Sequence, residues 1–323
     1  TDVAFDYWVR QYRTTLTVAA GNNGSYVASP GKAWNVITVG AYDDHNTISW
    51  AGDTVWAFSN YVNPQLYLGT RDREKPELVA PGVSIRMIDT NNNPVPWPGV
   101  NGTSYAAPQV AGLAALLMQR NSDLVTLPNA VKAILMASAV HNIEGYPDFR
   151  SDPNIPDLRD GAGGIAGAFA DTTAQVRANV NDTCSNSCWW NVAITDTVFT
   201  QQGGAMLPLH FEAAAGNRVR VAISWWAQSV ATPIPIWWAG DWHYMGNVLS
   251  INLDLVVRDP TGQEVARSAT FSNNYELVDF LAQRSGVYTI EVWRTSSSDT
   301  TNEVGVAFTQ LHQIYLPLIG KNF

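Results

Sequence analysis

A twelve-residue string, Asn101–Gly112, places a serine hydroxyl where a nucleophile could act. It reads Asn-Gly-Thr-Ser-Tyr-Ala-Ala-Pro-Gln-Val-Ala-Gly, and predicts a tight glycine turn that puts Ser104 at the start of a buried helix. The free N–H groups and the positive dipole end of such a helix stabilise negative charge. An oxyanion formed by attack of this hydroxyl on a carbonyl would be stabilised there, in part by the Ser104 N–H. A bare Gly-Thr-Ser would be typical of an ordinary helix with Ser104 as its cap. The whole twelve-residue string favours the interpretation of Ser104 as a nucleophile.

The segments around this string predict the elements that must position it. Strands are expected at 16–20, 36–41 and 78–80, and helices at 3–13, 102–120 and 127–139. The strands are short and almost wholly apolar, as in a sheet that is covered on both faces. Strands that alternate with helices predict an α/β fold with a mostly parallel sheet.

The pattern changes after Gly161-Ala162-Gly163-Gly164. Residues 176–190 are expected to form a linker, and from residue 191 onward the sequence alternates apolar and polar residues between turn motifs. Such alternation favours an all-β antiparallel sandwich or jelly roll. The expected organisation is therefore an α/β domain at 1–175, the linker, the sandwich at 191–312 and a tail at 313–323.

Composition argues against nucleic-acid binding and against a transmembrane segment. The chain of 323 residues carries a net charge of −9, which argues against binding to a phosphate backbone. It has no apolar run long enough to predict a transmembrane segment. The only cysteines, Cys184 and Cys188, could form a short-loop disulfide or half of a metal site, and the lack of a neighbouring histidine or further cysteine favours the disulfide. A disulfide indicates an oxidising compartment.

The serine string resembles the signature of the subtilase family, Gly-Thr-Ser-x-Ala-x-Pro-x-Val-Ala-Gly, and carries every fixed position of it. Further matches follow in family order over residues 16–168, including Ala80-Pro81-Gly82 and the Gly-x-Gly at 161–163. The resemblance implies a subtilisin-like serine endopeptidase that acts on proteins or peptides, with Ser104 as nucleophile. It also assigns the side chain of Asn22 to the oxyanion, with Asn23 as the neighbour that could be mistaken for it. Ala19, Ala20 and Gly21 would form one wall of the pocket for the substrate side chain.

The same resemblance predicts that part of the catalytic apparatus is missing. A serine needs a base to take its proton and a carboxylate to orient that base. The family supplies both from motifs that precede the oxyanion asparagine, and the chain has no room for them before Asn22. None of its five histidines has the family context; His45 and His141 are expected to be surface residues. We therefore expect the chain alone to be nearly inert, a fragment whose strand at 16–20 needs the N-terminal part of the same domain as partner.

The second half resembles the C-terminal β-barrel or jelly-roll domain of some secreted bacterial subtilases, over about residues 190–311. No cofactor is certain, but calcium is a candidate, with Asp254, Asp259 and Glu276 as oxygen ligands; turn and surface roles are the simpler interpretation. The tryptophans could form a binding platform or pack in the core, and these are Trp225, Trp226, Trp237, Trp238 and Trp242.

Two functional hypotheses remain at this stage. The first is a secreted serine endopeptidase. The second is a non-catalytic, pseudoprotease-like protein that binds through its β-sandwich. Retention of both Ser104 and Asn22 favours the first, because a degenerate site has no reason to keep both. A purely structural adhesin-like sandwich would leave the serine string unexplained.

Overall fold

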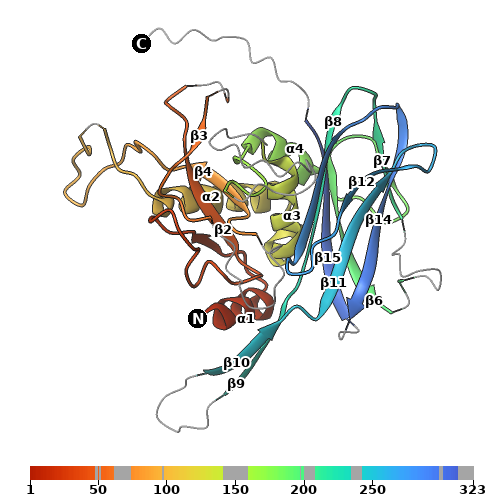
Figure 1. Ribbon diagram of the computed structural model, residues 1–323, viewed down its shortest axis with the longest axis horizontal. Coiled ribbons are helices and arrows are strands. Elements are labelled where there is room, and N and C mark those ends of the chain that lie inside the picture. The colour runs from red at the N-terminus through yellow and green to blue at the C-terminus, as the bar shows by residue number, and fades with distance from the viewer. Residues whose placement is uncertain are drawn as a thin grey trace.

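The computed structural model describes residues 1–47, 50, 52–61, 74–96, 98–140, 159–196, 198–199, 208–233, 242–297 and 301–311. An α/β half and an all-strand half lie side by side, with the longest helices in the first (Figure 1). Within the described residues, no helix is long and apolar enough to cross a membrane.

The α/β half follows the predicted order of elements closely. Its helices and strands are α1 (Asp2–Tyr12), β1 (Thr17–Ala19), β2 (Ile37–Asp43), β3 (Thr54–Val55), β4 (Leu78–Pro81), α2 (Thr103–Arg120), the 3₁₀ turn η1 (Ser122–Thr126), α3 (Pro128–Ser138) and α4 (Gly167–Gln175). The predicted strands and helices agree with these bounds to within two residues, whereas β3 and α4 were not predicted.

The sheet of this half is mostly parallel, as predicted. Strand β2 lies at its centre and pairs in parallel with β1 on one side and with β4 on the other. The short β3 pairs antiparallel with the end of β2, and Gly164 extends the sheet beyond β4 through a parallel bridge to Val79. Among the described residues, β1 pairs only with β2, so its other edge is open.

Helix α2 packs on one face of this sheet. Ile37, Val39 and Ala41 of β2 point to the same side because strand residues alternate, and they share a core with Ala106 and Val110 of α2. Small residues on α2 permit this close approach. The packing fixes the start of α2, and therefore Ser104, at the end of the sheet where β1 and β4 terminate.

A buried carboxylate ties β4 to β2 and to α3. Glu77 accepts hydrogen bonds from the Thr38 backbone N–H at 2.7 Å, from Lys132 Nζ at 2.7 Å and from Lys75. Burial alone would raise the pKa of Glu77, but the two lysines outweigh it and hold the pKa below its usual range. An ionised, fully hydrogen-bonded carboxylate therefore fixes the register of β4 against β2 at the start of both strands.

The second half consists of strands alone within its described residues. They form one sheet in the order β12-β11-β14-β7-β5 and another in the order β13-β8-β15-β6, with a hairpin of β9 and β10 apart from both. The two sheets contribute side chains to one shared core, for example Val221 and Val306 from one and Leu255 and Ile290 from the other. The bounds are β5 (Thr183–Cys184), β6 (Cys188–Thr195), β7 (Leu209–Ala213), β8 (Arg218–Trp225), β9 (Gln228–Pro233), β10 (Trp242–Val248), β11 (Ile251–Arg258), β12 (Glu264–Ser268), β13 (Tyr275–Leu281), β14 (Gly286–Ser297) and β15 (Thr301–Leu311).

The structure differs from the predicted linker at 176–190. Strand β5 and the first residues of β6 lie within that range, and Trp189 and Trp190 are fully buried. The cysteines that flank the turn between these strands are joined as the disulfide Cys184–Cys188. The polar turn residues indicated a linker, but Trp189 and Trp190 belong to β6, and each is buried in a different hydrophobic core.

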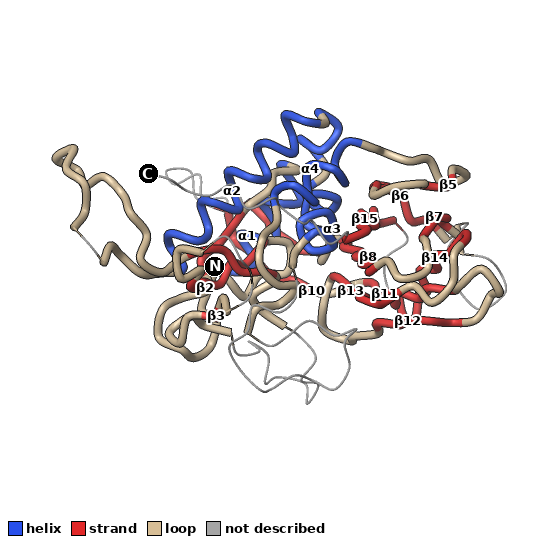
Figure 2. Tube along the Cα trace, turned by 90° about the horizontal axis from the view of Figure 1, so that it is seen from above, coloured by secondary structure: helices blue, strands red, loops and turns tan. Residues whose placement is uncertain are grey.

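The two halves are packed against each other through α3, which lies beside the strands β15 and β8 (Figure 2). Every residue of α3 is buried. Arg220 of β8 is also fully buried and donates hydrogen bonds to the carbonyl oxygens of Ala139, at the end of α3, and of Ala162 at 2.7 Å. Gly305 of β15 lies so close to α3 that a Cβ there would be 2.5 Å from the Ala130 backbone.

The candidate calcium ligands are engaged with protein groups, and Asp254 pairs with Arg267 at 3.8 Å. Asp259 accepts hydrogen bonds from the Thr261 and Gln263 backbone N–H groups and pairs with Arg284 at 2.6 Å. Glu276 is buried and accepts from Ser268 Oγ and from Thr270, whose N–H lies 2.8 Å away. No cluster of three or more His, Cys, Asp or Glu suited to a metal ion occurs in the described part of the chain.

Glu276 makes stability depend on pH. Burial raises the pKa of its carboxyl from 4.5 to about 8 despite the donors from Ser268 and Thr270. Between these two pH values the Glu276 carboxyl is therefore protonated in the folded state and ionised in the unfolded state. This contribution is complete below about pH 4.5 and is lost as pH rises to about 8. Glutamine mimics the neutral acid at every pH, so Glu276→Gln is the reference. We expect the difference in unfolding free energy, wild type minus Glu276→Gln, to fall by about 1.4 kcal/mol for each pH unit between about pH 4.5 and pH 8.

Urea denaturation of both proteins at pH 5, 6, 7 and 8 measures that difference. Glu212→Gln, at an exposed position of β7, is the matched control for the loss of a surface carboxylate. A difference for Glu276→Gln that stayed constant from pH 5 to pH 8 would contradict the assignment.

Of the tryptophans considered for a platform, Trp225 and Trp226 are buried, with 0% and 4% exposure, so they pack in the core. Trp237 and Trp238 lie outside the described residues, as do His141, His312 and the predicted tail. Trp242 begins β10, whose side chains are not described.

Candidate active site

Asn22 and the start of α2 are brought together although they are far apart in sequence. The side-chain oxygen of Asn22 accepts hydrogen bonds from the backbone N–H and the hydroxyl of Thr103, each at 2.8 Å. The Thr103 hydroxyl in turn accepts from the Gly21 N–H at 3.1 Å. Because a backbone N–H can only donate, the oxygen of the Asn22 amide must face Thr103, which leaves its NH₂ group as a free donor.

Ser104 is the residue that follows Thr103 and is exposed. Its backbone N–H has no backbone acceptor among the described residues, because it belongs to the first turn of α2. No acidic side chain lies in that turn to neutralise the positive end of the helix dipole. Two donors near the start of α2 are therefore without a partner among the described residues: the Ser104 N–H, and the NH₂ group of Asn22, whose oxygen is bound by the preceding residue Thr103.

The loop that carries Asn22 is held by Asn60, which is 3% exposed. The Asn60 side-chain oxygen accepts from the N–H groups of Asn23 at 2.9 Å and Ser25 at 3.2 Å, and its NH₂ group donates to the Tyr26 carbonyl at 2.8 Å. Gly21 makes this contact possible, because its φ of +113° is favourable for glycine and a Cβ there would overlap the Asn60 side chain.

Sequence reasoning missed two positioning residues. Thr103 stood inside the recognised string but was given no role of its own, although a hydroxyl next to the nucleophile was a visible signal. Asn60 follows Phe58 and Ser59 in an ordinary loop sequence. Nothing in that sequence indicates that the Asn60 side chain reaches the 21–26 loop.

Replacement of Asn60 by alanine should loosen this loop. The change leaves the N–H groups of Asn23 and Ser25 without their acceptor in a partly buried place, so we expect a loss of about 1–3 kcal/mol in the unfolding free energy. Thermal or urea unfolding measures it. Asn91→Ala, at an exposed position of another loop, is the control and should change stability by less than about 0.5 kcal/mol. Equal stability of the two variants would contradict the role of Asn60.

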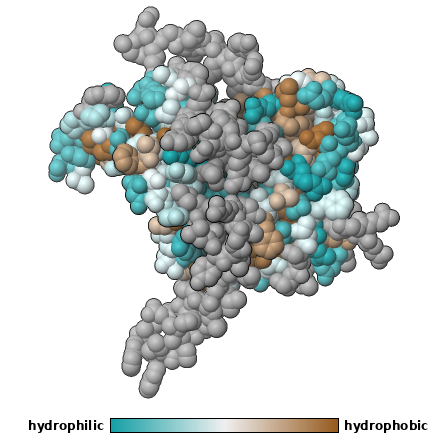
Figure 3. Space-filling view, viewed as in Figure 1, coloured by the Kyte–Doolittle hydropathy of each residue, from teal (hydrophilic) through white to brown (hydrophobic). Residues whose placement is uncertain are grey.

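The predicted pocket wall leads into the same loop. Ala20 is buried, with its N–H donating to Val39, whereas Ala19 and Gly21 are partly exposed. The chain between β4 and α2, described at 82–96 and 98–102, projects from this half of the molecule, and hydrophobic surface is visible on the projection (Figures 1 and 3). Met87 and Ile88 of that loop are 39% and 62% exposed.

None of the described residues supplies a base for Ser104. His45 lies in an exposed turn near Asp43 and Thr54, as predicted, and His210 lies on β7 next to Thr289. The side chain of His243 is not described. The Ser104 hydroxyl has no hydrogen-bond partner in the described part of the structure.

Helix α2, which begins at Thr103, also carries exposed apolar residues. Leu116 of α2 is 62% exposed, and Ala111, Gly112 and Ala115 on the same helix are exposed as well. Helix α2 packs against β1 as well as β2, and the other edge of β1 has no strand partner among the described residues. Exposed apolar residues on a helix that otherwise packs in the core are typical of a surface that another segment covers.

Comparison with known proteins defines the class to which this arrangement belongs. The model of the subtilase family, a family of serine proteases, matches residues 6–184. That match covers more than half of the chain, so the protein belongs to the subtilase family.

The relatives share the same part of the chain. The protein is 39% identical over 154 residues to serine protease AprX of Bacillus subtilis (strain 168), covering 43% of this chain and 32% of that protein. It is 36% identical over 120 residues to a thermophilic serine proteinase of Bacillus sp. (strain AK1), covering 37% and 25%. The chain therefore spans about a third or less of the length of these relatives. Among solved structures, the patellamide maturation protease PatA matches with 26% identity and a TM-score of 0.40, over 53% of this chain and 54% of that one.

Proposed function

We propose that this chain is the nucleophile-bearing part of a serine endopeptidase, with Ser104 as nucleophile and Asn22 in the oxyanion hole. One observation carries the proposal: Thr103 holds the Asn22 amide so that its NH₂ group is free next to an exposed serine at a helix N-terminus. A non-catalytic protein that binds through its β-sandwich would gain nothing from these two unused donors.

In the proposed reaction, Ser104 Oγ attacks the carbonyl carbon of a peptide bond and passes its proton to a base. The carbonyl oxygen becomes an oxyanion that accepts hydrogen bonds from the Asn22 NH₂ group and the Ser104 N–H. Collapse of the intermediate expels the amine, which takes the proton from the base, and leaves an ester on Ser104. Water, deprotonated by the same base, then hydrolyses the ester and restores the hydroxyl.

The base and its carboxylate are proposed to come from a segment outside these 323 residues. The open edge of β1 supports this, because a strand that paired with it would reach the loop that carries Asn22. The exposed apolar residues of α2 also support a covering segment. Ala19, Ala20 and Gly21 are proposed to border the pocket for the substrate side chain. Secretion is supported by the Cys184–Cys188 disulfide, which is typical of oxidising compartments.

Reading the coding DNA in frame upstream of Thr1 tests the proposal, together with peptide hydrolysis by the product of the whole reading frame. The proposal expects codons for Asp-Thr/Ser-Gly and then His-Gly-Thr-His, and hydrolysis by the whole product but not by the 323-residue chain alone. A reading frame without an aspartate and a histidine in those contexts, and a product without hydrolytic activity, would exclude the endopeptidase and leave the binding protein.

A further inference from the structure

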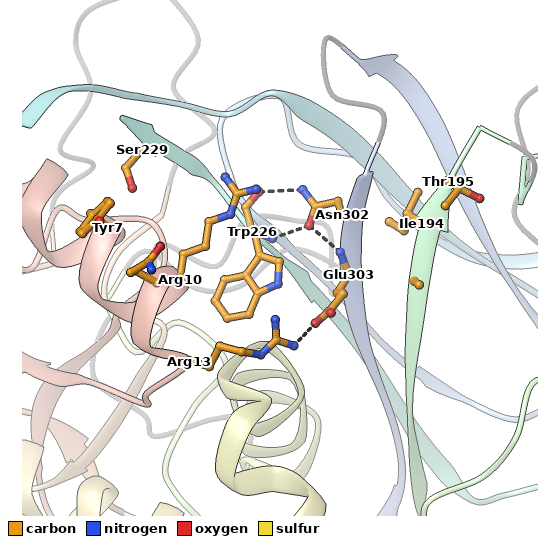
Figure 4. Close-up of a pocket in the computed structure, with 11 residues that line it drawn as sticks. Tyr7, Arg10, Arg13, Ile194, Thr195, Trp226, Ser229, Asn302 and Glu303 are labelled. Carbon is orange, nitrogen blue, oxygen red and sulfur yellow. Dashed lines mark hydrogen bonds and ion pairs between the residues drawn. The ribbon is translucent and has the colours of Figure 1, made fainter. Parts of the chain in front are cut away.

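A second site lies between helix α1 and the β-sandwich, and none of its lining residues belongs to the Ser104 site. The cavity measures about 520 Å³ and is bordered by α1, β6, β15 and the residues that follow β8. Figure 4 shows side chains from both halves of the molecule around it, with Arg10 and Arg13 reaching from the side of α1 toward Trp226. This volume lies within the range of small-molecule pockets.

Arg10 differs from the other arginines of this acidic protein. In the described part of the chain it has no hydrogen bond, ion pair or ring contact, although it is only partly exposed and lines the cavity. Nine other arginines form ion pairs within the described residues, and these are Arg13, Arg120, Arg177, Arg218, Arg220, Arg258, Arg267, Arg284 and Arg294. A guanidinium without a partner in a cavity, in a chain of net charge −9, is a ready donor for an anion.

A second polar group in the same cavity is also unused. The hydroxyl of Ser229 is buried and, among the described residues, has no hydrogen-bond partner, although it can both donate and accept. Buried polar groups nearly always have a partner, so an orphaned hydroxyl in the wall of a cavity points to a ligand.

The remaining lining determines the charge and the character of that ligand. Arg13 pairs with Glu303 in the cavity wall, so Arg10 leaves the site with one uncompensated positive charge. A doubly charged phosphate would lie close to the Glu303 carboxylate, whereas a single carboxylate balances Arg10. Trp226 and Ile194 give the wall an apolar part.

We propose that this pocket binds a carboxylate carried on an apolar body, with the Arg10 guanidinium as its ion-pair partner and the Ser229 hydroxyl as a second donor. Such a carboxylate could belong to a free organic acid or to the C-terminus of a peptide. Both present the planar pair of oxygens that a guanidinium binds through two parallel hydrogen bonds.

Titration calorimetry on the product of the whole reading frame tests the proposal with three probes: phenylacetate, the acetylated tripeptide Ala-Ala-Phe with a free carboxylate, and the same tripeptide as its amide. We expect at least one carboxylate probe to bind, and Arg10→Gln to weaken it by about tenfold or more because the charged hydrogen bonds are lost. Ser229→Ala should weaken it by about threefold to tenfold. Arg267→Gln, which removes an exposed arginine of β12, is the matched control and should bind like the wild type.

The probes also distinguish the two sources. Tighter binding of the tripeptide acid than of phenylacetate identifies a peptide C-terminus, and equal or tighter binding of phenylacetate identifies a free acid. The proposal fails if no carboxylate binds at about 10 mM, if the tripeptide amide binds as well as the acid, or if Arg10→Gln binds like the wild type while its melting curve shows it folded.

Discussion

Replacement of Ser104 by alanine should lower the turnover of the complete protease by about 10⁶-fold, the size of the loss measured in subtilisin, a member of the same family. The reason is chemical: without the hydroxyl no ester can form, and only the binding of substrate and the oxyanion donors remain. Because those groups are unchanged, KM should stay within about threefold of the wild type.

Peptide hydrolysis by the product of the whole reading frame measures this effect. Ser122→Ala removes another exposed serine hydroxyl, in η1, and serves as the matched control with wild-type turnover expected. If Ser104→Ala kept more than about a hundredth of wild-type turnover, another residue would be the nucleophile.

Replacement of Asn22 by leucine should lower kcat by about 10²–10³-fold with little change in KM, again the range measured in subtilisin for its oxyanion asparagine. Leucine keeps the shape of the side chain but removes the NH₂ group, which acts only on the charge that develops in the transition state. It also removes the oxygen that accepts from Thr103, so the melting curve of the variant must show that it is folded. The effect should therefore appear in kcat.

Asn23→Leu is the matched control, because the two asparagines are neighbours in one exposed loop. The structure separates them: Asn22 turns toward Thr103, whereas the Asn23 side-chain oxygen accepts from the Ser25 N–H at 3.1 Å within the loop. We expect Asn23→Leu to reduce kcat by less than about tenfold. If Asn23→Leu lowered kcat more than Asn22→Leu did, the oxyanion donor would be Asn23.

Local sequence patterns were sufficient to predict the elements that position the site. The apolar runs at 36–41 and 78–80 became β2 and β4, and the string that contains Ser104 became the start of α2. These predictions succeeded because burial on both faces of a parallel sheet requires uninterrupted apolar residues, and because a glycine turn followed by small apolar residues has few alternatives.

The features that were missed depend on contacts between distant residues. Asn60 holds the loop of Asn22 by accepting from the Asn23 N–H, 37 positions away in the sequence, and its own neighbours give no sign of it. The cavity beside Arg10 is lined by α1, β6, β15 and the residues after β8, so it depends on contacts between segments far apart in the sequence, which no periodicity encodes.

The predicted linker differs from the structure for a local reason. The polar turn residues between Cys184 and Cys188 are typical of a connecting segment, and they outweighed the strand signal of Trp189 and Trp190. Both tryptophans are buried, one in each of the two large cores, so this stretch belongs to the packed interior of the molecule.

Covalent labelling tests the central claim most directly. The product of the whole reading frame is treated with a fluorophosphonate, which reacts with a serine only when a base activates it, and the labelled peptide is identified by mass spectrometry. The account predicts a single adduct on Ser104, weaker labelling in Asn22→Leu and none in Ser104→Ala. An adduct on a different serine, or no adduct in a product that hydrolyses peptides, would contradict it.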